Sequence, residues 1–218
     1  MDNVLRKLLF VVAATLLALA PSALADSTVY VYGTYAFANN GYGIPPYPGT
    51  LNENLADFYC VDFSHDITGG DTWQAVTTPV IPDGNYGSTY LGNPGSATYA
   101  GSNTAAGNDY LVFAWLLTQM TQDSNQGDQA AYQWAIWSLT GGTDPITSGP
   151  WDASNLIGDA EWAIDGGYNG AGWEILTPDV GQYGQEFMVR TPEPSTVLLL
   201  ALGLCGLFFV KRRQDQLS

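Results

Sequence analysis

Cys60 is the residue of this sequence whose type and position offer the most reactive chemistry. The chain of 218 residues has two cysteines, and the other, Cys205, lies in an apolar run near the C-terminus. Cys60 therefore has no partner for an intramolecular disulfide in the region that precedes that run. The remaining possibilities are a buried inert thiol, an intermolecular disulfide or a more specialised bond.

A cysteine–histidine hydrolase is one catalytic alternative, because His65 lies five positions after Cys60. In a regular strand, however, residues at this spacing point to opposite faces of the sheet. Acidic neighbours would also raise the pKa of the thiol, so we do not expect this pair to be catalytic. Asp62 would share the Cys60 face, where it could orient an amine or act as a base, and a solvated or hydrogen-bonded acid is the simpler interpretation.

Two short segments suggest a specialised bond at Cys60. Residues 59–61 read Tyr-Cys-Val, and residues 133–137 read Gln-Trp-Ala-Ile-Trp. They resemble the two signature segments of bacterial thioester domains, an aromatic-Cys-apolar motif and a Gln-x-x-apolar-Trp motif. In that family the cysteine and glutamine side chains condense with loss of ammonia. The resemblance implies a thioester between Cys60 and Gln133 in this chain, and a domain that attaches covalently to amines.

The positions of these residues are compatible with such a bond. Cys60 and Gln133 are 73 positions apart, so only the folded domain could bring them together. Gln133, Ile136 and Trp137 share one face of a predicted helix, which places the amide beside bulky apolar groups that keep water away. Asp62 completes the expected surroundings of the bond. The alternative is that Ile136 and the tryptophans are core residues.

The acidic residues suggest two other kinds of site. Residues 123–128 resemble a calcium-binding loop, but the glycine stands at the fifth position, and Trp134 occupies the twelfth, where glutamate is expected. This segment is better interpreted as a polar helix-capping loop, and we expect neither a metal nor a cofactor. Glu161 and Glu174 could form the carboxylate pair of a glycosidase, but the sequence does not determine their separation.

Charge excludes one large class of partners. Residues 26–190 contain 18 acidic side chains, one basic side chain and no lysine, which gives a net charge of −17. Such a surface repels phosphate backbones, so binding to nucleic acid is excluded. The 165 residues of this region suffice for one domain with a core of its own.

The N-terminal segment, residues 1–25, has the three parts of a secretory signal peptide. Arg6 and Lys7 are basic, the run 8–20 is apolar, and residues 23–25 read Ala-Leu-Ala at the expected cleavage site. The sequence therefore predicts an exported protein.

The C-terminal segment has three elements in a characteristic order. Pro192, Glu193 and Pro194 precede the apolar run 196–210, and three basic residues follow that run. A helix through the run would anchor the chain in the inner membrane, with the basic cluster on the cytoplasmic side. The arrangement resembles the PEP-CTERM sorting signal. This resemblance implies processing by an exosortase-type enzyme, often alongside exopolysaccharide production, and a final place at the cell surface or in the extracellular matrix.

Residues 26–190 are predicted to form one α+β domain, with 191–218 as the sorting tail. Apolar patterns predict strands at 27–38, 55–67, 72–78, 174–177 and 186–190, and helices at 110–120, 128–139 and 152–164. The strand at 27–38 is predicted to be followed by a Gly/Pro loop that includes Gly43, Pro45 and Pro46. The stretch 79–107, rich in Gly, Asn, Pro and Ser, predicts a long exposed loop. The expected architecture is an antiparallel β-sheet or sandwich carrying an inserted helical block, followed by a C-terminal transmembrane helix.

Three functions are consistent with these observations. The first is a non-enzymatic surface or matrix protein whose Cys60–Gln133 thioester captures an amine-bearing partner, as an adhesin or crosslinker. The second is a passive matrix component with an unmodified Cys60. The third is a carbohydrate-active enzyme. An intact mass separates the first two.

Overall fold

Eight strands and three helices make up the part of the chain that this computed structural model describes, residues 26–92, 106–146 and 148–191. Both predicted terminal segments, the signal peptide and the helix of the tail, lie outside these described residues. No helix within the described ranges is both long and apolar enough to cross a membrane. Residues 24–190, between the two ends, form one compact unit.

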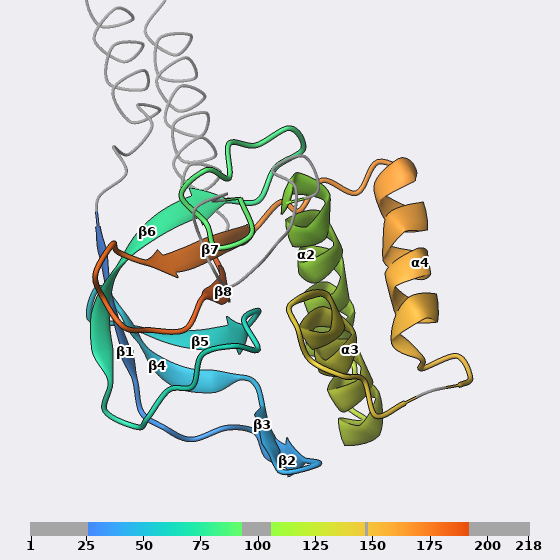
Figure 1. Cartoon of the computed structure of the whole chain (residues 1–218), viewed down its shortest axis with the longest axis horizontal. Helices are drawn as coiled ribbons and strands as arrows, with labels where there is room; N and C mark the ends of the chain where they lie inside the picture. Colours follow the sequence, from blue (N-terminus) through green and yellow to red (C-terminus); the bar gives the residue numbers. More distant parts are fainter. Residues whose placement is uncertain (1–25, 93–105, 147, 192–218) are drawn as a thin grey trace, which may run out of the picture. The chain divides into compact units, whose positions relative to one another are not determined.

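Six strands close into an antiparallel barrel. They are β1 (Ser27–Val31), β4 (Tyr47–Leu51), β5 (Asn54–Cys60), β6 (Thr72–Pro79), β7 (Trp173–Pro178) and β8 (Phe187–Arg190). The order around the barrel is β1-β4-β5-β8-β7-β6, as Figure 1 shows. Closure depends on β1, because Val29 pairs with Leu51 on one side and with Trp73 on the other. The predicted α+β class is confirmed, and the open sheet or sandwich is corrected to a barrel.

A hairpin of β2 (Phe37–Asn39) and β3 (Tyr42–Ile44) lies between β1 and β4 in the sequence. The prediction of an irregular Gly/Pro loop here is wrong. Asn40 and Gly41 join the two strands and both have positive φ, 49° and 85°. Two such residues form the tight turn that matches the twist of a hairpin, and an Asn-Gly pair is its usual sequence.

The strand that carries Cys60 ends at that residue, whereas the sequence predicts a strand as far as residue 67. The Asp62 carboxylate accepts a hydrogen bond of 2.8 Å from the backbone N–H of Ser64, which forms a local turn. The alternation of strand faces therefore does not apply to Asp62 and His65. Their positions depend on this turn instead.

The three helices are inserted between β6 and β7, which confirms the predicted helical block. They are α2 (Ala106–Gln122), α3 (Gln126–Leu139) and α4 (Ala153–Asp165), and each contacts the other two. Asn125 caps α3 by accepting from the Gly127 N–H, and Asp152 caps α4 by accepting from the Ser154 N–H. The acidic segment before α3 is thus a capping loop, as predicted. Among the described residues, no group of three potential ligands is placed to hold a metal ion.

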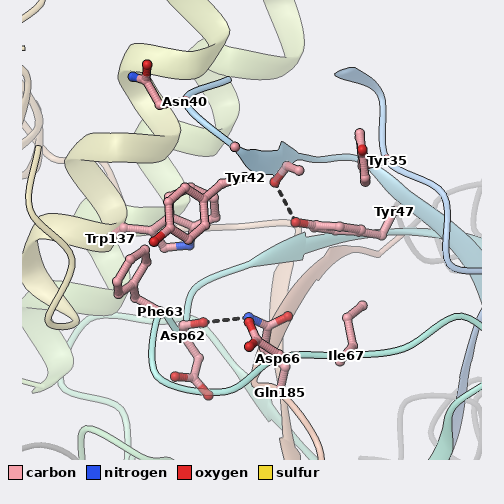
Figure 2. A pocket seen from close by; sticks show the side chains of 12 residues that line it. Tyr35, Asn40, Tyr42, Tyr47, Asp62, Phe63, Asp66, Ile67, Trp137 and Gln185 are labelled. Atoms are coloured by element: carbon pink, nitrogen blue, oxygen red, sulfur yellow. Dashed lines mark hydrogen bonds between the residues drawn. The ribbon is translucent and has the colours of Figure 1, made fainter. Parts of the chain in front are cut away.

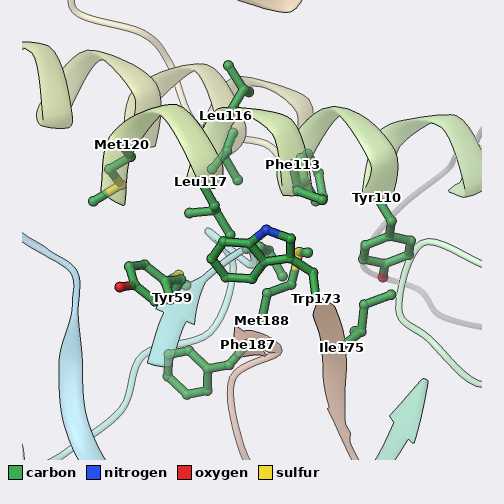
Figure 3. Close-up of a cluster of buried hydrophobic side chains, with 14 of the residues drawn as sticks. Tyr59, Tyr110, Phe113, Leu116, Leu117, Met120, Trp173, Ile175, Phe187 and Met188 are labelled. Carbon is green, nitrogen blue, oxygen red and sulfur yellow. The ribbon is translucent and has the colours of Figure 1, made fainter. Parts of the chain in front are cut away.

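The main core lies between α2 and one side of the barrel. Figure 3 shows Phe113 and Leu117 of α2 directed toward the last two strands, which contribute Trp173, Ile175, Phe187 and Met188. Those strands are buried on nearly every residue, because one of their faces lines the barrel and the other lies against the helix. A hydrogen bond of 2.9 Å from the Trp173 indole to Thr118 also joins β7 to α2. This layer fixes the helical block on the barrel.

Candidate functional site

The structure brings Cys60 and Gln133 together. The Gln133 Nε2 group donates a hydrogen bond of 2.8 Å to the backbone carbonyl of Cys60. Both residues have an exposed fraction of 0 %. β5 supplies the cysteine from its last position and α3 supplies the glutamine from its middle, so the contact depends on α3 crossing the end of this strand.

The other half of the Gln133 amide has no hydrogen-bond partner in the part of the chain that the structure describes. Its Oε1 atom is buried and accepts no hydrogen bond from the described residues. An orphaned buried acceptor costs about 1–3 kcal/mol, so native proteins keep few of them. This amide is therefore held beside Cys60 with its carbonyl oxygen unsatisfied.

Trp137 covers the sulfur. Its indole Nε1 donates a hydrogen bond of 3.2 Å to the Cys60 Sγ, and the thiol itself donates to the backbone carbonyl of Asp62 at 3.2 Å. Ile136 is fully buried on the same helix and Trp137 is 3 % exposed. Gln133, Ile136 and Trp137 are all among the buried residues of α3, together with Ala130, Ala131, Trp134 and Ala135.

The Cys60 thiol is a poor nucleophile as it stands. Burial is the main reason that its pKa is raised far above the ordinary value, and the negative charges of Asp62 and Asp66 raise it further. The hydrogen bond from Trp137 offsets part of this effect. The predicted influence of acidic neighbours is confirmed in direction, although burial is the larger cause.

Asp62 holds the loop that follows Cys60. It is 1 % exposed, and its Oδ2 atom lies 2.6 Å from His65 Nδ1 and 3.5 Å from the Glu186 backbone N–H. The backbone carbonyl of Asp62 also accepts from Gln185 Nε2 at 2.6 Å. His65 thus pairs with Asp62, and the hydrogen bonds of the Cys60 sulfur involve other residues. The structure gives no cysteine–histidine dyad at this position.

A pocket of about 610 Å³ opens next to this cluster. Figure 2 shows Tyr42, Phe63 and Trp137 together on one side of it, with Asp66 and Gln185 on the other. The ring centroids of the three aromatic residues lie 5.3–5.9 Å apart. Tyr35, Tyr47, Asp62 and Ile67 also line the pocket, together with Asn40, Gly41 and Gly43 of the β2–β3 hairpin. Cys60 lies behind Trp137 and Asp62, which contact its sulfur and also line the pocket.

Sequence reasoning missed the wall of this pocket. Tyr42 belongs to the hairpin that was expected to be a loop, and Phe63 and Asp66 belong to the turn that was expected to be a strand. Gln185 lies two residues before the start of β8. The Asn-Gly turn was the one local signal that could have located the hairpin.

A second buried polar cluster was also missed. The Glu186 carboxylate accepts hydrogen bonds from the Tyr110 hydroxyl at 2.5 Å, the Thr177 hydroxyl at 2.6 Å and the Tyr90 N–H at 2.9 Å. Burial raises the pKa of Glu186 to about 7, against the lowering effect of these hydrogen bonds. Three donors from separate segments of the domain satisfy this buried carboxylate, as in a cluster that stabilises the core.

The remaining candidates are not brought together. Glu161 lies on α4 and Glu174 on β7, and neither lines the pocket. Glu161 instead acts on Asp109, whose pKa is raised to about 6 mainly by burial and further by this neighbour. The sorting residues Pro192, Glu193 and Pro194 lie outside the described part of the chain.

Comparison with known proteins identifies the tail. Residues 190–213 match the family described as the PEP-CTERM protein-sorting motif. No curated protein and no solved structure matches the chain. The match begins at the last residue of β8 and so leaves nearly the whole barrel and its helices outside it. On the evidence of its tail, the chain is an exported protein that carries a PEP-CTERM sorting motif and is processed by an exosortase at the membrane.

Proposed function

We propose that this is a non-enzymatic surface or matrix protein in which Cys60 and Gln133 form an internal thioester that captures an amine-bearing partner. The observation that carries the proposal is the buried contact between the two residues, which leaves the Gln133 Oε1 without a hydrogen bond. The sorting motif supplies the context, because export places the domain where it can meet surface or matrix partners.

The chemistry requires two steps. In the first, the Cys60 sulfur bonds to the Gln133 Cδ, and the amide nitrogen leaves as ammonia with the thiol proton. In the second, a primary amine of the partner attacks the same carbon. An amide then joins the partner to the Gln133 side chain, and the Cys60 thiol is released with one proton from the amine. No oxidant or cofactor takes part in either step.

The environment favours the condensed form in two ways. An amide oxygen is a stronger hydrogen-bond acceptor than a thioester oxygen, so a site that offers the Gln133 Oε1 no donor penalises the amide more. Burial also disfavours the charged thiolate, which is the leaving group in hydrolysis, and Trp137 shields the sulfur from water. The contact between Gln133 Nε2 and the Cys60 carbonyl is the interaction that condensation would remove.

The composition of the domain supports capture from outside. Residues 26–190 contain no lysine, so no ε-amine of the domain competes for the bond. A domain with a reactive acyl group and its own lysines would risk crosslinking itself. A generally acidic composition would also explain the absence of lysine. The intact mass therefore decides between a thioester and an unmodified Cys60.

The test is an intact mass of the purified full-length chain. We expect a deficit of one ammonia relative to the sequence and no free thiol at Cys60 after rapid denaturation at mildly acidic pH. Cys60→Ser and Gln133→Glu should each abolish the deficit, because each removes one partner of the bond. Methylamine should restore a reactive Cys60 thiol and add its mass at Gln133.

A matched control separates the bond from general damage. Gln129→Glu changes the same side chain one turn earlier on α3, where the amide donates to the Asp123 carbonyl, and should leave the deficit intact. Freshly prepared protein with the full sequence mass and a titratable Cys60 thiol would refute the thioester. The passive matrix component would then be the remaining function.

A further inference from the structure

The pocket beside Cys60 combines two features that seldom occur together by chance. One side consists of the mutually contacting rings of Tyr42, Phe63 and Trp137, and the other carries the Asp66 carboxylate and the Gln185 amide. We propose that this pocket binds the protonated form of a primary amine, with the cation between the aromatic faces and the acceptors opposite them.

The charge of the residues that line the pocket favours a cation over a neutral ligand. Two carboxylates and no basic residue line the pocket. In the described part of the chain, Asp66 makes no hydrogen bond or ion pair with another residue. The nearest imidazole, His65, is already paired with Asp62. A ligand with a positive charge would therefore compensate a charge that the protein itself leaves uncompensated.

The aromatic side fits the same ligand. Faces of Tyr and Trp rings attract an organic cation within about 6 Å of the ring centroid, most strongly where water is excluded. Tyr42 is 44 % exposed whereas Trp137 is 3 % exposed, so the three rings extend from the surface to the Cys60 sulfur. A cation bound on these rings would lie close to the candidate thioester.

The acceptors favour N–H donors over a quaternary ammonium group. Gln185 is 7 % exposed, its Nε2 is engaged by the Asp62 carbonyl, and its Oε1 accepts no hydrogen bond from the described residues. Together with Asp66 it offers a primary ammonium two acceptors. The choice of a primary amine also rests on the proposed thioester, since only an amine with N–H bonds can form the amide. The preference for a cation does not depend on that bond.

The experiment measures binding without covalent capture. The full-length chain carrying Cys60→Ser, purified in detergent, is titrated with n-butylamine at pH 7 while the Trp137 indole N–H resonance is followed by NMR. The resonance is assigned with Trp137→Phe. We expect a saturable shift with the amine and none with n-butanol, which has the same alkyl chain without the charge.

Two matched variants localise the site. Asp66 is exposed, so Asp66→Asn should weaken binding roughly threefold to tenfold, as expected for one charge-assisted contact at the surface. Asp159→Asn makes the same charge change on α4, outside the pocket, and should leave the affinity unchanged. Equal weakening by both variants would show a general charge effect and overturn the proposal.

Other outcomes also bear on the proposal. No saturation by the amine, or a neutral sugar shifting the same resonance in its place, overturns it. Should Cys60→Ser fail to fold, the wild type at pH 5.5 serves instead, because an amine with a pKa of about 10.4 is then protonated and cannot attack. If the protein has its full sequence mass and still binds the amine, the proposed binding site is supported and only the thioester is refuted.

Discussion

Two buried polar clusters lie on either side of Asp62, and they differ in how completely their hydrogen bonds are satisfied. The Glu186 carboxylate has three donors, from Tyr110, Thr177 and Tyr90. Gln133 has one partner for its N–H group and none among the described residues for its oxygen. A satisfied cluster stabilises one packing of the core, whereas an unsatisfied one retains a group that can gain from a reaction. The first is therefore structural, and the second is the candidate site.

The largest expected effect is at the satisfied cluster. Glu186→Ala leaves three donors without an acceptor in the core and should lower the free energy of unfolding by about 5 kcal/mol. Glu186→Gln retains an acceptor and should cost about 1–2 kcal/mol. Urea unfolding measures both. Similar values for the two variants would mean that side-chain volume matters here and the hydrogen bonds do not.

The second prediction concerns the unsatisfied cluster. A thioester between Cys60 and Gln133 closes a loop of the chain, which stabilises the fold by up to about 4 kcal/mol through the entropy of the unfolded state. Opening it with methylamine should therefore lower the unfolding midpoint in urea. The Cys60→Ser variant, treated in the same way, should not change. An unchanged midpoint in the wild type would contradict the crosslink.

The third prediction uses pH to separate the clusters. The pKa of Glu186 is raised to about 7 by burial, so the folded protein holds a proton that the unfolded chain releases near pH 4.5. Stability from this group is complete below the lower value and is lost as the pH rises through about 7, by roughly 3 kcal/mol. Glu186→Gln should remove this dependence, whereas Cys60→Ser should retain it. If the unfolding free energies of the wild type and Glu186→Gln depend on pH in the same way, the proton is bound by a group other than Glu186.

The smallest expected effect is at the indole that covers the sulfur. Trp137→Phe removes the hydrogen bond to Cys60 Sγ while keeping an aromatic ring, and should cost about 1 kcal/mol of unfolding free energy. Trp162→Phe is the control, because Trp162 is 79 % exposed on α4 and should change stability very little. Hydrolysis of the thioester, measured as release of the Cys60 thiol in water, should be faster in Trp137→Phe than in the wild type and unchanged in Trp162→Phe. Equal release rates would show that the indole does not protect the bond.

The helices and the later strands were predictable from local patterns. The apolar spacing on α2, α3 and α4 and the capping loop before α3 agree with the structure, because helix formation depends on residues three or four apart. Barrel closure was not predictable, since β1 pairs with strands that are distant in the sequence. The β2–β3 hairpin was missed although its Asn-Gly turn is a local signal.

The candidate site was predictable in part. Cys60 and Gln133 were named from short motifs, and their contact depends on where α3 crosses β5. The turn at Asp62 displaced the residues after Cys60 from the strand geometry that was expected of them. Phe63 and Asp66 consequently line a pocket that no periodic pattern describes.

The sequence by itself determined export, the sorting tail, the acidic and lysine-free character of the domain, and its single thiol, because each depends on composition or on a short contiguous motif. Only the tertiary structure decided that no described residue donates to the Gln133 oxygen and that an aromatic and acidic pocket opens beside Cys60. Hydrogen-bond satisfaction and pocket shape are properties of groups that converge from distant segments. They exist only once β3, the loop after β5, α3 and the segment before β8 meet in the folded domain.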